Sequence, residues 1–600
     1  MIHKLSHLFR PEETRLTLEE GNQVQRYQHS YHQALHRINR IKVDSLLPEY
    51  QKMGSSLHRG VESKEVIISA FLYACNRLPD CMPLVQEVVV ASSLQTLQDH
   101  GLGQITAWQQ VQAEKRRRTA FFDGRQRLVV LVTSLSDLDD LIPGLCAYQI
   151  EWNKMHRRLI GYGPARALAD KEVRASEMDS KVRNALGLNR ADHDAIRQLW
   201  GRDWDRKIAA LAAGGKDITL QILPLREKDF RHLAREWWEG VMAFFDAYDV
   251  RNRPVYLVTS NNHSLVNLAL DFGDRHTERI RQFAAQHCSK EFNQAMARLE
   301  DEDPLASRNM LYLAQAQLLA KDEGFAQAKQ EMESEAGIQR TKPLPPLLAE
   351  AQLIELGRLR PHSMDPRLRL KDPGKLSKSR AVIFNTDYPL GFAAFHLLKT
   401  AAHYLHDWRG LFILGKSAAM IGRLGDILIP SQVRDIHSKR LYCFKNCFSA
   451  RNLIPHLCDS AVFDDQRSLT VQGTFLHSWD TVRDLHRADF TGIEMEAGPC
   501  LAAVRDLFQA GGLKDASMVE IQVPLDFHLG ILHYSSDTPY NLRASLLSRP
   551  LGLTGLEATY SCSLAIMQYI LDQECHPVAG AERARRSPWT FPLIKRPRKA

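Results

Sequence analysis

The chain has 600 residues, which is too many for one hydrophobic core, so two or three domains are expected. With 44% hydrophobic and 25% charged residues, its composition excludes a disordered or collagen-like chain. Most of the net charge of +8 comes from residues 578–600, where seven Lys and Arg residues face only Glu582. We therefore expect a basic, flexible tail there and no specific nucleic-acid partner.

The sequence shows no pattern typical of a membrane span or of a secretory signal. No hydrophobic run approaches the roughly 18–20 residues that cross a membrane, and the first ten residues lack the hydrophobic core of a secretory signal. The ten cysteines include no CxxC pair and no dense framework, which indicates reduced thiols. We expect a cytoplasmic protein without a membrane partner.

Three N-terminal segments share one pattern, in which a hydrophobic run ends at small polar residues and leads into a helix-like stretch. They cover residues 88–100, 129–141 and 255–268. A strand, a polar turn and a helix in this order predict βα units, so residues 1–340 are expected to form a helix-rich α/β region. Two alternatives stay open for the polar residues after these strands, helix capping and a second ligand site. The residues are Ser134, Ser136, Asn261, Asn262 and His263.

Residues 341–379 differ in composition from their surroundings, because they are rich in Pro, Lys and Arg and lose hydrophobic periodicity after Leu359. This composition predicts a linker. After it, short hydrophobic runs alternate with helix-like segments, which predicts a second α/β domain over residues 380–577.

Two patterns that often mark ligand sites fail on their context. Residues 410–417 match the GxxxxGK[ST] pattern of phosphate-binding loops, but the residues between the glycines are Leu, Phe, Ile and Leu, which predict a buried strand. Cys443, Cys447, His456 and Cys458 lack the spacing of a structural zinc site. We expect neither a metal ion nor a cofactor.

Three segments of the predicted second domain occur in a distinctive order. They are GKSAAMIGRLGDILIP (415–430), GIEMEAG (492–498) and HYSSDTP (533–539), and the segment QGTFLHS (472–478) precedes the second of them. This order resembles the nucleoside phosphorylase superfamily, which includes purine nucleoside phosphorylases, methylthioadenosine nucleosidases and AMP nucleosidases. The resemblance implies a three-layer α/β/α domain and a homo-oligomer.

The same resemblance implies a site for a purine nucleoside or nucleotide. Asp537 would protonate the departing base, and Ser536 would help to hold that carboxyl group. Glu496, next to Glu494 in the motif, would accept hydrogen bonds from the ribose hydroxyls, while Met495 would lie against the sugar. The alternatives are a turn-forming aspartate for Asp537 and a solvated helix edge for the two glutamates.

Three further residues follow from the resemblance. Phe475 would stack on the base, with core packing as the alternative, and Gly415 would begin the glycine-rich turn. Asp387 lies in the segment 381–395, which corresponds to the first strand of the superfamily domain and the turn after it, where phosphorylases hold phosphate with a glycine and an arginine. No basic residue follows it until Lys399, so Asp387 is a candidate general base that activates water, or else a turn-forming residue.

Lys416 is unusual for the glycine-rich turn, where small residues are expected. Together with Arg423 and His437 it would bind a 5′-phosphate, with structural ion pairs as the alternative. The predicted function is hydrolysis of the N-glycosidic bond of a purine nucleotide or nucleoside, similar to that of AMP nucleosidases. Phosphorolysis and a non-catalytic nucleotide sensor are the alternatives.

Overall fold

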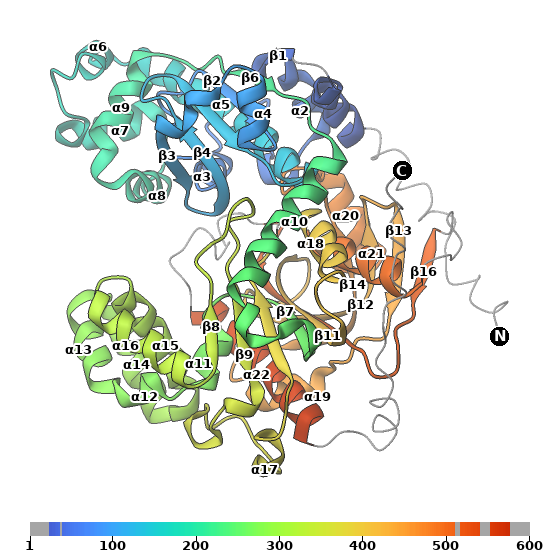
Figure 1. Cartoon of the computed structure of the whole chain (residues 1–600). Coiled ribbons are helices and arrows are strands. Elements are labelled where there is room, and N and C mark those ends of the chain that lie inside the picture. The colour runs from blue at the N-terminus through green and yellow to red at the C-terminus, as the bar shows by residue number, and fades with distance from the viewer. Residues whose placement is uncertain (1–22, 37–38, 390, 510–516, 541–552, 576–600) are drawn as a thin grey trace, which may run out of the picture.

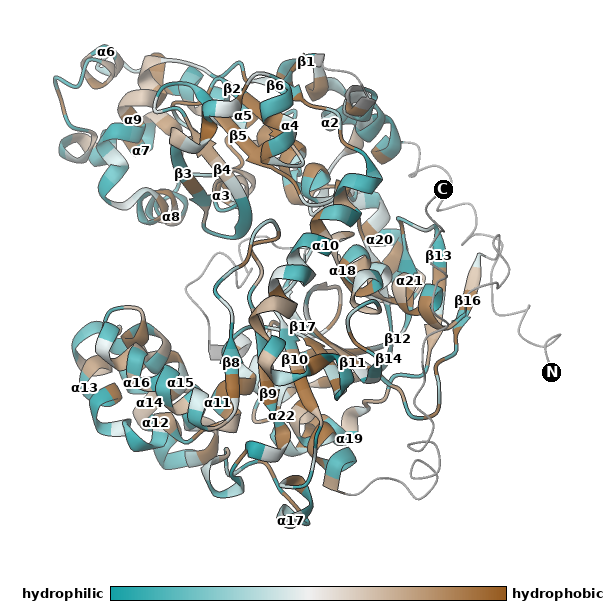
Figure 2. Cartoon of the chain, viewed as in Figure 1, coloured by the Kyte–Doolittle hydropathy of each residue, from teal (hydrophilic) through white to brown (hydrophobic). Residues whose placement is uncertain are grey.

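The computed structural model describes residues 23–36, 39–389, 391–509, 517–540 and 553–575, which form two β-sheets covered by helices (Figure 1). We refer to residues 23–226 as the N-terminal unit and to residues 227–575 as the C-terminal unit. Figure 2 shows hydrophobic residues concentrated on interior strands such as β5 and β10. The mixed α/β class predicted from the sequence is confirmed.

The N-terminal unit contains a six-stranded sheet, within the described residues, in the order β1-β6-β2-β5-β4-β3. Its strands are β1 (Asn39–Lys42), β2 (Glu87–Ala91), β3 (Gln109–Ala113), β4 (Arg116–Phe122), β5 (Arg127–Leu131) and β6 (Thr219–Ile222). Its α-helices are α2 (Leu47–Met53), α3 (Ile68–Cys75), α4 (Leu94–Asp99), α5 (Leu135–Ile160), α6 (Ala165–Ala169), α7 (Asp179–Leu186), α8 (Arg190–Trp200) and α9 (Trp204–Ala213). The predicted βα units at 88–100 and 129–141 are confirmed as β2–α4 and β5–α5.

The C-terminal unit contains an eleven-stranded sheet, counted over the described residues. Its strands are β7 (Pro254–Thr259), β8 (Ile338–Arg340), β9 (Ala351–Glu355), β10 (Val382–Thr386), β11 (Asp407–Ala419), β12 (Ile427–Asp435), β13 (Arg440–Phe444), β14 (Val462–Thr470), β15 (Phe490–Glu494), β16 (Met518–Ile521) and β17 (His528–Asp537). The centre is parallel, because β7 pairs with β10 and β11, and β11 pairs with β17. In such sheets, ligand sites usually lie beyond the carboxyl ends of the strands.

Helices cover both faces of this sheet. They are α10 (Glu227–Phe244), α11 (Ser264–Ala269), α12 (Phe272–Arg275), α13 (Thr277–His287), α14 (Lys290–Glu302), α15 (Pro304–Leu319), α16 (Glu323–Glu335), α17 (Pro373–Leu376), α18 (Ala393–Ala401), α19 (Ala450–Leu453), α20 (Trp479–Arg487), α21 (Ala497–Phe508) and α22 (Leu553–Cys575). Successive strand residues point to opposite faces. Accordingly, Leu411 and Ile413 of β11 pack in a core with α10, α18 and α21, whereas Phe412 and Leu414 pack in a core with α11, α15 and α22.

The predicted domain boundary is wrong. Strand β7, assigned from the sequence to the N-terminal region, lies between β10 and β11 in the larger sheet. Strand β9, inside the predicted linker 341–379, pairs antiparallel with β10 from Glu355 opposite Val382 to Ala351 opposite Thr386. The prediction failed because β9 is a short buried strand flanked by residues whose Pro-rich and basic composition is typical of a linker. The predicted tail, 578–600, lies outside the described residues.

The two units are joined by helix α10 (Figure 1) and by the segment 471–478 between β14 and α20. Phe230 and Leu233 of α10 belong to the core of the N-terminal unit, while Trp237 and Trp238 belong to a core of the C-terminal unit. In the segment 471–478, Phe475 and Leu476 are buried in the core of the N-terminal unit. The backbone N–H of Ser56 also donates to the carbonyl of His477, at 2.9 Å. These contacts fix the N-terminal unit beside the ends of the C-terminal strands.

Candidate active site

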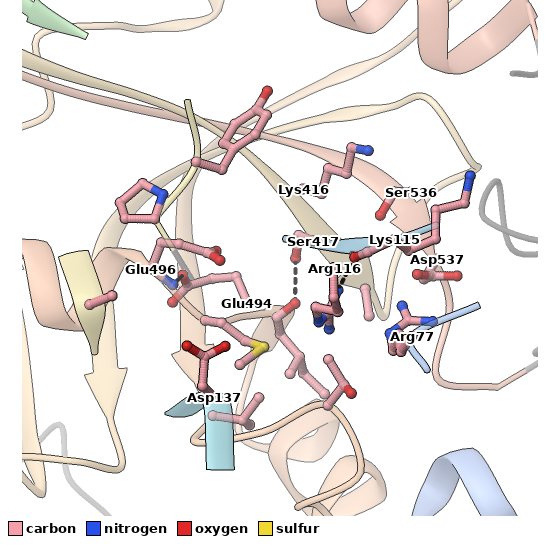
Figure 3. Close-up of a pocket in the computed structure, with 18 of the residues that line it drawn as sticks. Arg77, Lys115, Arg116, Asp137, Lys416, Ser417, Glu494, Glu496, Ser536 and Asp537 are labelled. Carbon is pink, nitrogen blue, oxygen red and sulfur yellow. Dashed lines mark hydrogen bonds between the residues drawn. The ribbon is translucent and has the colours of Figure 1, made fainter. Parts of the chain in front are cut away.

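A cavity of about 420 Å³ lies where the two units meet (Figure 3). From the C-terminal unit, it is lined by the ends of β11, β15 and β17, by the residues after β14, and by Tyr388 and Pro389 after β10. From the N-terminal unit, it is lined by residues of α3, of the β3–β4 hairpin and of the start of α5. Its volume is within the range of small-molecule sites.

Strand register brings several predicted site residues together. Strands β11 and β17 run parallel, with Lys416 opposite Tyr534 and Ala418 opposite Asp537, and the register shifts between Ser417 and Ala418. The two strands therefore end on the same side of the sheet. Lys416 and Asp537 both line the cavity as a result.

Glu494 is held by the start of helix α21. One carboxylate oxygen accepts hydrogen bonds from the backbone N–H groups of Glu496 and Ala497, at 2.6 and 2.7 Å, and the other accepts from the hydroxyl of Thr470. Burial and the nearby charge of Glu496 nevertheless raise the pKa of Glu494 to about 8. Because both of its oxygens are engaged, Glu494 organises the turn that presents its neighbours.

Met495 and Glu496 follow directly and line the cavity. Burial raises the pKa of Glu496 to about 7, although hydrogen bonds from backbone groups and the charges of Arg116 and Lys416 oppose this rise. A carboxyl group with this pKa changes its charge near neutral pH. It is therefore suited to bind hydroxyl groups or to exchange a proton.

Asp537 lies at the opposite end of the cavity from Glu496, at the end of β17 (Figure 3). Burial raises its pKa to about 7, and the charges of Arg77 and Lys416 oppose this rise. Its Oδ1 atom is buried and has no hydrogen-bond partner among the described residues. Ser536, the preceding residue, also lines the cavity. A buried carboxyl oxygen without a partner is costly, which is typical of a group that binds a ligand.

Successive arginine side chains at the start of β4 contact opposite neighbours. Arg116 donates two hydrogen bonds of 2.7 Å to the carboxylate of Asp140 in α5, and Arg118, two positions on, also pairs with Asp140. Arg117 points the other way and pairs with Asp387 of the C-terminal unit at 2.6 Å. Three consecutive arginines are typical of a solvated helix face, but residues 116–118 belong to strand β4, whose side chains alternate between its two faces.

Asp387 does not line the cavity, whereas the next residue, Tyr388, does. Its Oδ2 atom accepts from Arg117, and its Oδ1 accepts from the backbone N–H of Tyr388 at 3.1 Å. Burial raises its pKa, against the influence of Arg117. Since Arg117 and the N–H of Tyr388 engage both oxygens and Asp387 itself does not line the cavity, the prediction of Asp387 as the base that activates water is corrected: Asp387 links the chain at Tyr388 to the N-terminal unit.

Phe475 is fully buried outside the cavity, with its ring 5.3 Å from that of Tyr73 in an edge-on arrangement. The prediction that it stacks on a base is corrected to the alternative of core packing. Its neighbours Thr474 and His477 line the cavity instead. Gly415 also lies outside the cavity. The ring of His533 packs against it so closely that a Cβ atom at residue 415 would lie 2.7 Å from that ring.

Arg423 and His437 do not join Lys416. The side chain of Arg423 is 73% exposed and donates to the carbonyl of Asp459, and neither residue lines the cavity. The ring of His437 is buried 5.2 Å from that of Phe392, and burial lowers its pKa. The predicted phosphate-binding trio is therefore corrected to Lys416 alone.

The polar residues after the N-terminal strands act mainly in the fold. Ser134 caps α5 by accepting from the N–H of Asp137, and Asn261 accepts from the N–H groups of His263 and Ser264. The hydroxyl of Ser136 accepts from the N–H of Phe392 in the C-terminal unit, at 2.9 Å. Asn262 donates to the carboxylate of Glu350. The second ligand remains a prediction.

Sequence reasoning missed the contribution of the N-terminal unit to the cavity. Tyr73, Arg77, Lys115, Arg116 and Asp137 all line it. Among the described residues, no cluster of His, Cys, Asp and Glu could hold a metal ion. Nor does any helix in the described ranges have the length and apolar character needed to cross a membrane.

Comparison with known proteins places the chain in a family. The model of the "Family of unknown function (DUF6909)" matches residues 43–572, which is most of the chain. A search of curated proteins finds no match.

Several solved structures are similar to part of the chain. A putative methylthioadenosine nucleosidase from Weissella paramesenteroides has 13% identity and a TM-score of 0.26, over 41% of this chain and 96% of that one. A 5′-methylthioadenosine nucleosidase from Arabidopsis thaliana has 14% identity and a TM-score of 0.25, over 42% and 92%. A methylthioadenosine phosphorylase from an Antarctic soil metagenomic library has 9% identity and a TM-score of 0.24, over 36% and 81%.

Proposed function

We propose that this chain, which belongs to the family of unknown function DUF6909, hydrolyses the N-glycosidic bond of a purine nucleoside or nucleotide. The observation that carries this proposal is the state of Asp537. Its carboxyl group lines the cavity, has a pKa raised to about 7, and has an Oδ1 atom without a partner among the described residues. Such a group holds a proton near neutral pH and can deliver it to a ligand.

The reaction needs an acid at one end of the substrate. As the C–N bond breaks, positive charge develops on the ribose and negative charge on the departing base. Asp537 donates its proton to a base nitrogen, water adds its oxygen to the sugar carbon, and a proton of that water restores the acid. The products are the free base and ribose or ribose phosphate. One positioned acid contributes about 10²–10⁴-fold to such a rate.

Glu496 has the complementary role at the other end of the cavity. In its ionised form it accepts hydrogen bonds from the ribose hydroxyls, and its charge favours the positive ribose of the transition state. Met495 provides an apolar surface beside it. Glu494 takes no direct part in this proposal, because the turn before α21 engages both of its oxygens.

Phosphorolysis is the second candidate, and Lys416 favours it. This side chain lines the cavity and makes no ion pair with another described residue, so it could hold inorganic phosphate as the nucleophile. The product would then be ribose 1-phosphate instead of ribose.

The test is incubation of the full chain with adenosine, inosine, guanosine and their 5′-monophosphates, with and without inorganic phosphate, followed by chromatography of the free base. Hydrolysis predicts base release in phosphate-free buffer, with ribose or ribose 5-phosphate as the second product. Strict dependence on phosphate would replace hydrolysis by phosphorolysis. Binding without any base release would reject both enzymatic proposals and leave a nucleotide sensor.

A further inference from the structure

Three cationic side chains surround the Asp537 end of the cavity. Arg77 follows α3, Lys115 lies in the turn between β3 and β4, and Lys416 lies on β11, and Figure 3 shows all three on the same side of the cavity as Asp537. We call them the cationic end. Two of the three belong to the N-terminal unit.

Arg77 is the most informative of the three, because it is only 5% exposed. Its guanidinium lies 3.2 Å from the ring centre of Tyr73, and one nitrogen donates to the Tyr73 carbonyl at 3.0 Å. Its buried Nε atom has no partner among the described residues, and the structure gives it no ion pair within the described part of the chain. A buried cation without a full set of partners is costly unless a ligand supplies an acceptor.

Lys416 and Lys115 are less constrained. Lys416 is exposed to the cavity and makes no ion pair or hydrogen bond with another described residue. Lys115 pairs with its neighbour Glu114 at 2.7 Å, in an exposed position that water screens. Arginine and lysine side chains donate hydrogen bonds and cannot accept them. The cationic end is therefore matched to a ligand group that only accepts.

We propose that the cationic end selects a purine that carries a carbonyl oxygen, such as hypoxanthine or guanine, over the aminopurine adenine. This inference rests on the proposed function in one respect, because Asp537 marks the end of the cavity that receives the base. A carbonyl oxygen accepts hydrogen bonds from Arg77 or Lys416, whereas the amino group of adenine is itself a donor and cannot accept a hydrogen bond from these cations. The same cations favour the negative charge that develops on the departing base.

The expected selectivity is large enough to measure. Hydrogen bonds to charged groups are stronger than those between neutral groups, and a site built around such bonds strongly rejects an analogue that lacks the matching group. We expect inosine to be cleaved with a kcat/KM at least about tenfold higher than that of adenosine. Lys416→Met and Arg77→Lys should each reduce this preference several-fold, since the first removes a cation and the second removes the planar donor fork.

Lys445→Met is the matched control. Lys445 is an exposed lysine in the loop after β13 and does not line the cavity, so its removal should leave the preference for inosine unchanged. Lys416→Met alters an exposed side chain and is expected to fold like the wild type. An unchanged preference in both Lys416→Met and Arg77→Lys would overturn the proposal.

Three measurements separate failure of this inference from failure of the proposed function. Base release from adenosine at a rate equal to or above that from inosine overturns the inference and leaves the function in place. If no nucleoside is cleaved, calorimetry with the free bases decides: hypoxanthine binding about tenfold tighter than adenine, lost in Lys416→Met, supports the inference alone. If neither base binds, both proposals fail. If AMP is cleaved with a higher kcat/KM than adenosine, while inosine is not, the cations bind phosphate and the assignment of the base to this end of the cavity is wrong.

Discussion

The carboxyl groups in the cavity differ in what occupies their oxygens. Glu494 is buried, and two N–H groups and a hydroxyl donate to its oxygens. Asp537 has a raised pKa with one oxygen unpartnered. Burial raises the pKa of both groups, but the hydrogen bonds favour a structural role for Glu494 and leave one oxygen of Asp537 available to a ligand.

The first prediction at this scale concerns pH. In the proposed reaction, Glu496 acts when ionised and Asp537 acts when protonated, and the pKa of each is raised to about 7. The kcat/KM for base release should therefore rise and then fall with pH, with a maximum near 7. Because the charge of Arg77 lowers the pKa of Asp537, Arg77→Met should move the falling limb to higher pH. A rate that stays constant between pH 6 and 9 would contradict the assignment of both groups.

The second prediction concerns stability. Burial raises the pKa of Glu494 from 4.5 to about 8, so the folded state binds this proton more tightly than the unfolded chain does. Its contribution to stability is complete below about pH 4.5 and is lost as pH rises through about 8. Glu494→Gln keeps the shape without the charge, so the fall in Tm between pH 6 and pH 9 should be smaller than in the wild type. An equal or larger fall would mean that Glu494 is ionised in the native state.

At the scale of elements, the β3–β4 hairpin explains why part of the site escaped prediction. The sequence RRRTAFF predicts exposed charge when it is taken as a helix, but as strand β4 it directs Arg116 and Arg118 to α5 and Arg117 to the C-terminal unit. The motifs of β11, α21 and β17 were easier to recognise from the sequence, because each is local and its glycine and acidic residues lie at strand ends. The role of Phe475 was predicted wrongly because its side chain packs in the core of the N-terminal unit, which its local motif does not reveal.

Asp140 is the centre of the contacts of this hairpin. It pairs with Arg116 and Arg118, and it accepts from the hydroxyl of Thr474 at 3.0 Å. Asp140→Asn leaves two arginines, both with little exposure, without their carboxylate, and we expect a loss of about 3–5 kcal/mol in the free energy of unfolding.

Urea denaturation gives this value, and Asp170→Asn provides the control. Asp170 is an exposed aspartate, 3.8 Å from Arg166, whose loss should change stability by less than about 0.5 kcal/mol. Similar effects of the two substitutions would show that the buried arginines find other partners.

At the scale of the whole molecule, the sequence predicted the mixed α/β class, and six of the site residues that it predicted from local motifs line one cavity. They are Lys416, Glu494, Met495, Glu496, Ser536 and Asp537. It could not predict that residues 73–137 complete the same cavity, because that contact depends on how two cores pack together across more than 250 residues of chain. For the same reason, β7 was assigned to the wrong unit.

The position of β7 leads to a prediction about fragments. A fragment beginning at residue 380 lacks β7, β8 and β9, so β10 loses both of its neighbouring strands and β11 loses one. We expect it not to unfold cooperatively, whereas a fragment beginning at residue 227 should do so. Thermal unfolding followed by circular dichroism distinguishes them. A cooperative transition in the shorter fragment would restore the boundary that the composition predicted.

The central claim is that Asp537 is the acid that protonates a departing base. Asn has nearly the shape of Asp but cannot donate a proton as an acid, so Asp537→Asn isolates the chemistry from the fold. The most direct measurement is base release by wild type and Asp537→Asn side by side, together with the affinity of each for the same nucleoside. The account predicts a rate lower by about 10²–10⁴-fold with affinity changed by less than about tenfold. Full activity of Asp537→Asn would contradict it.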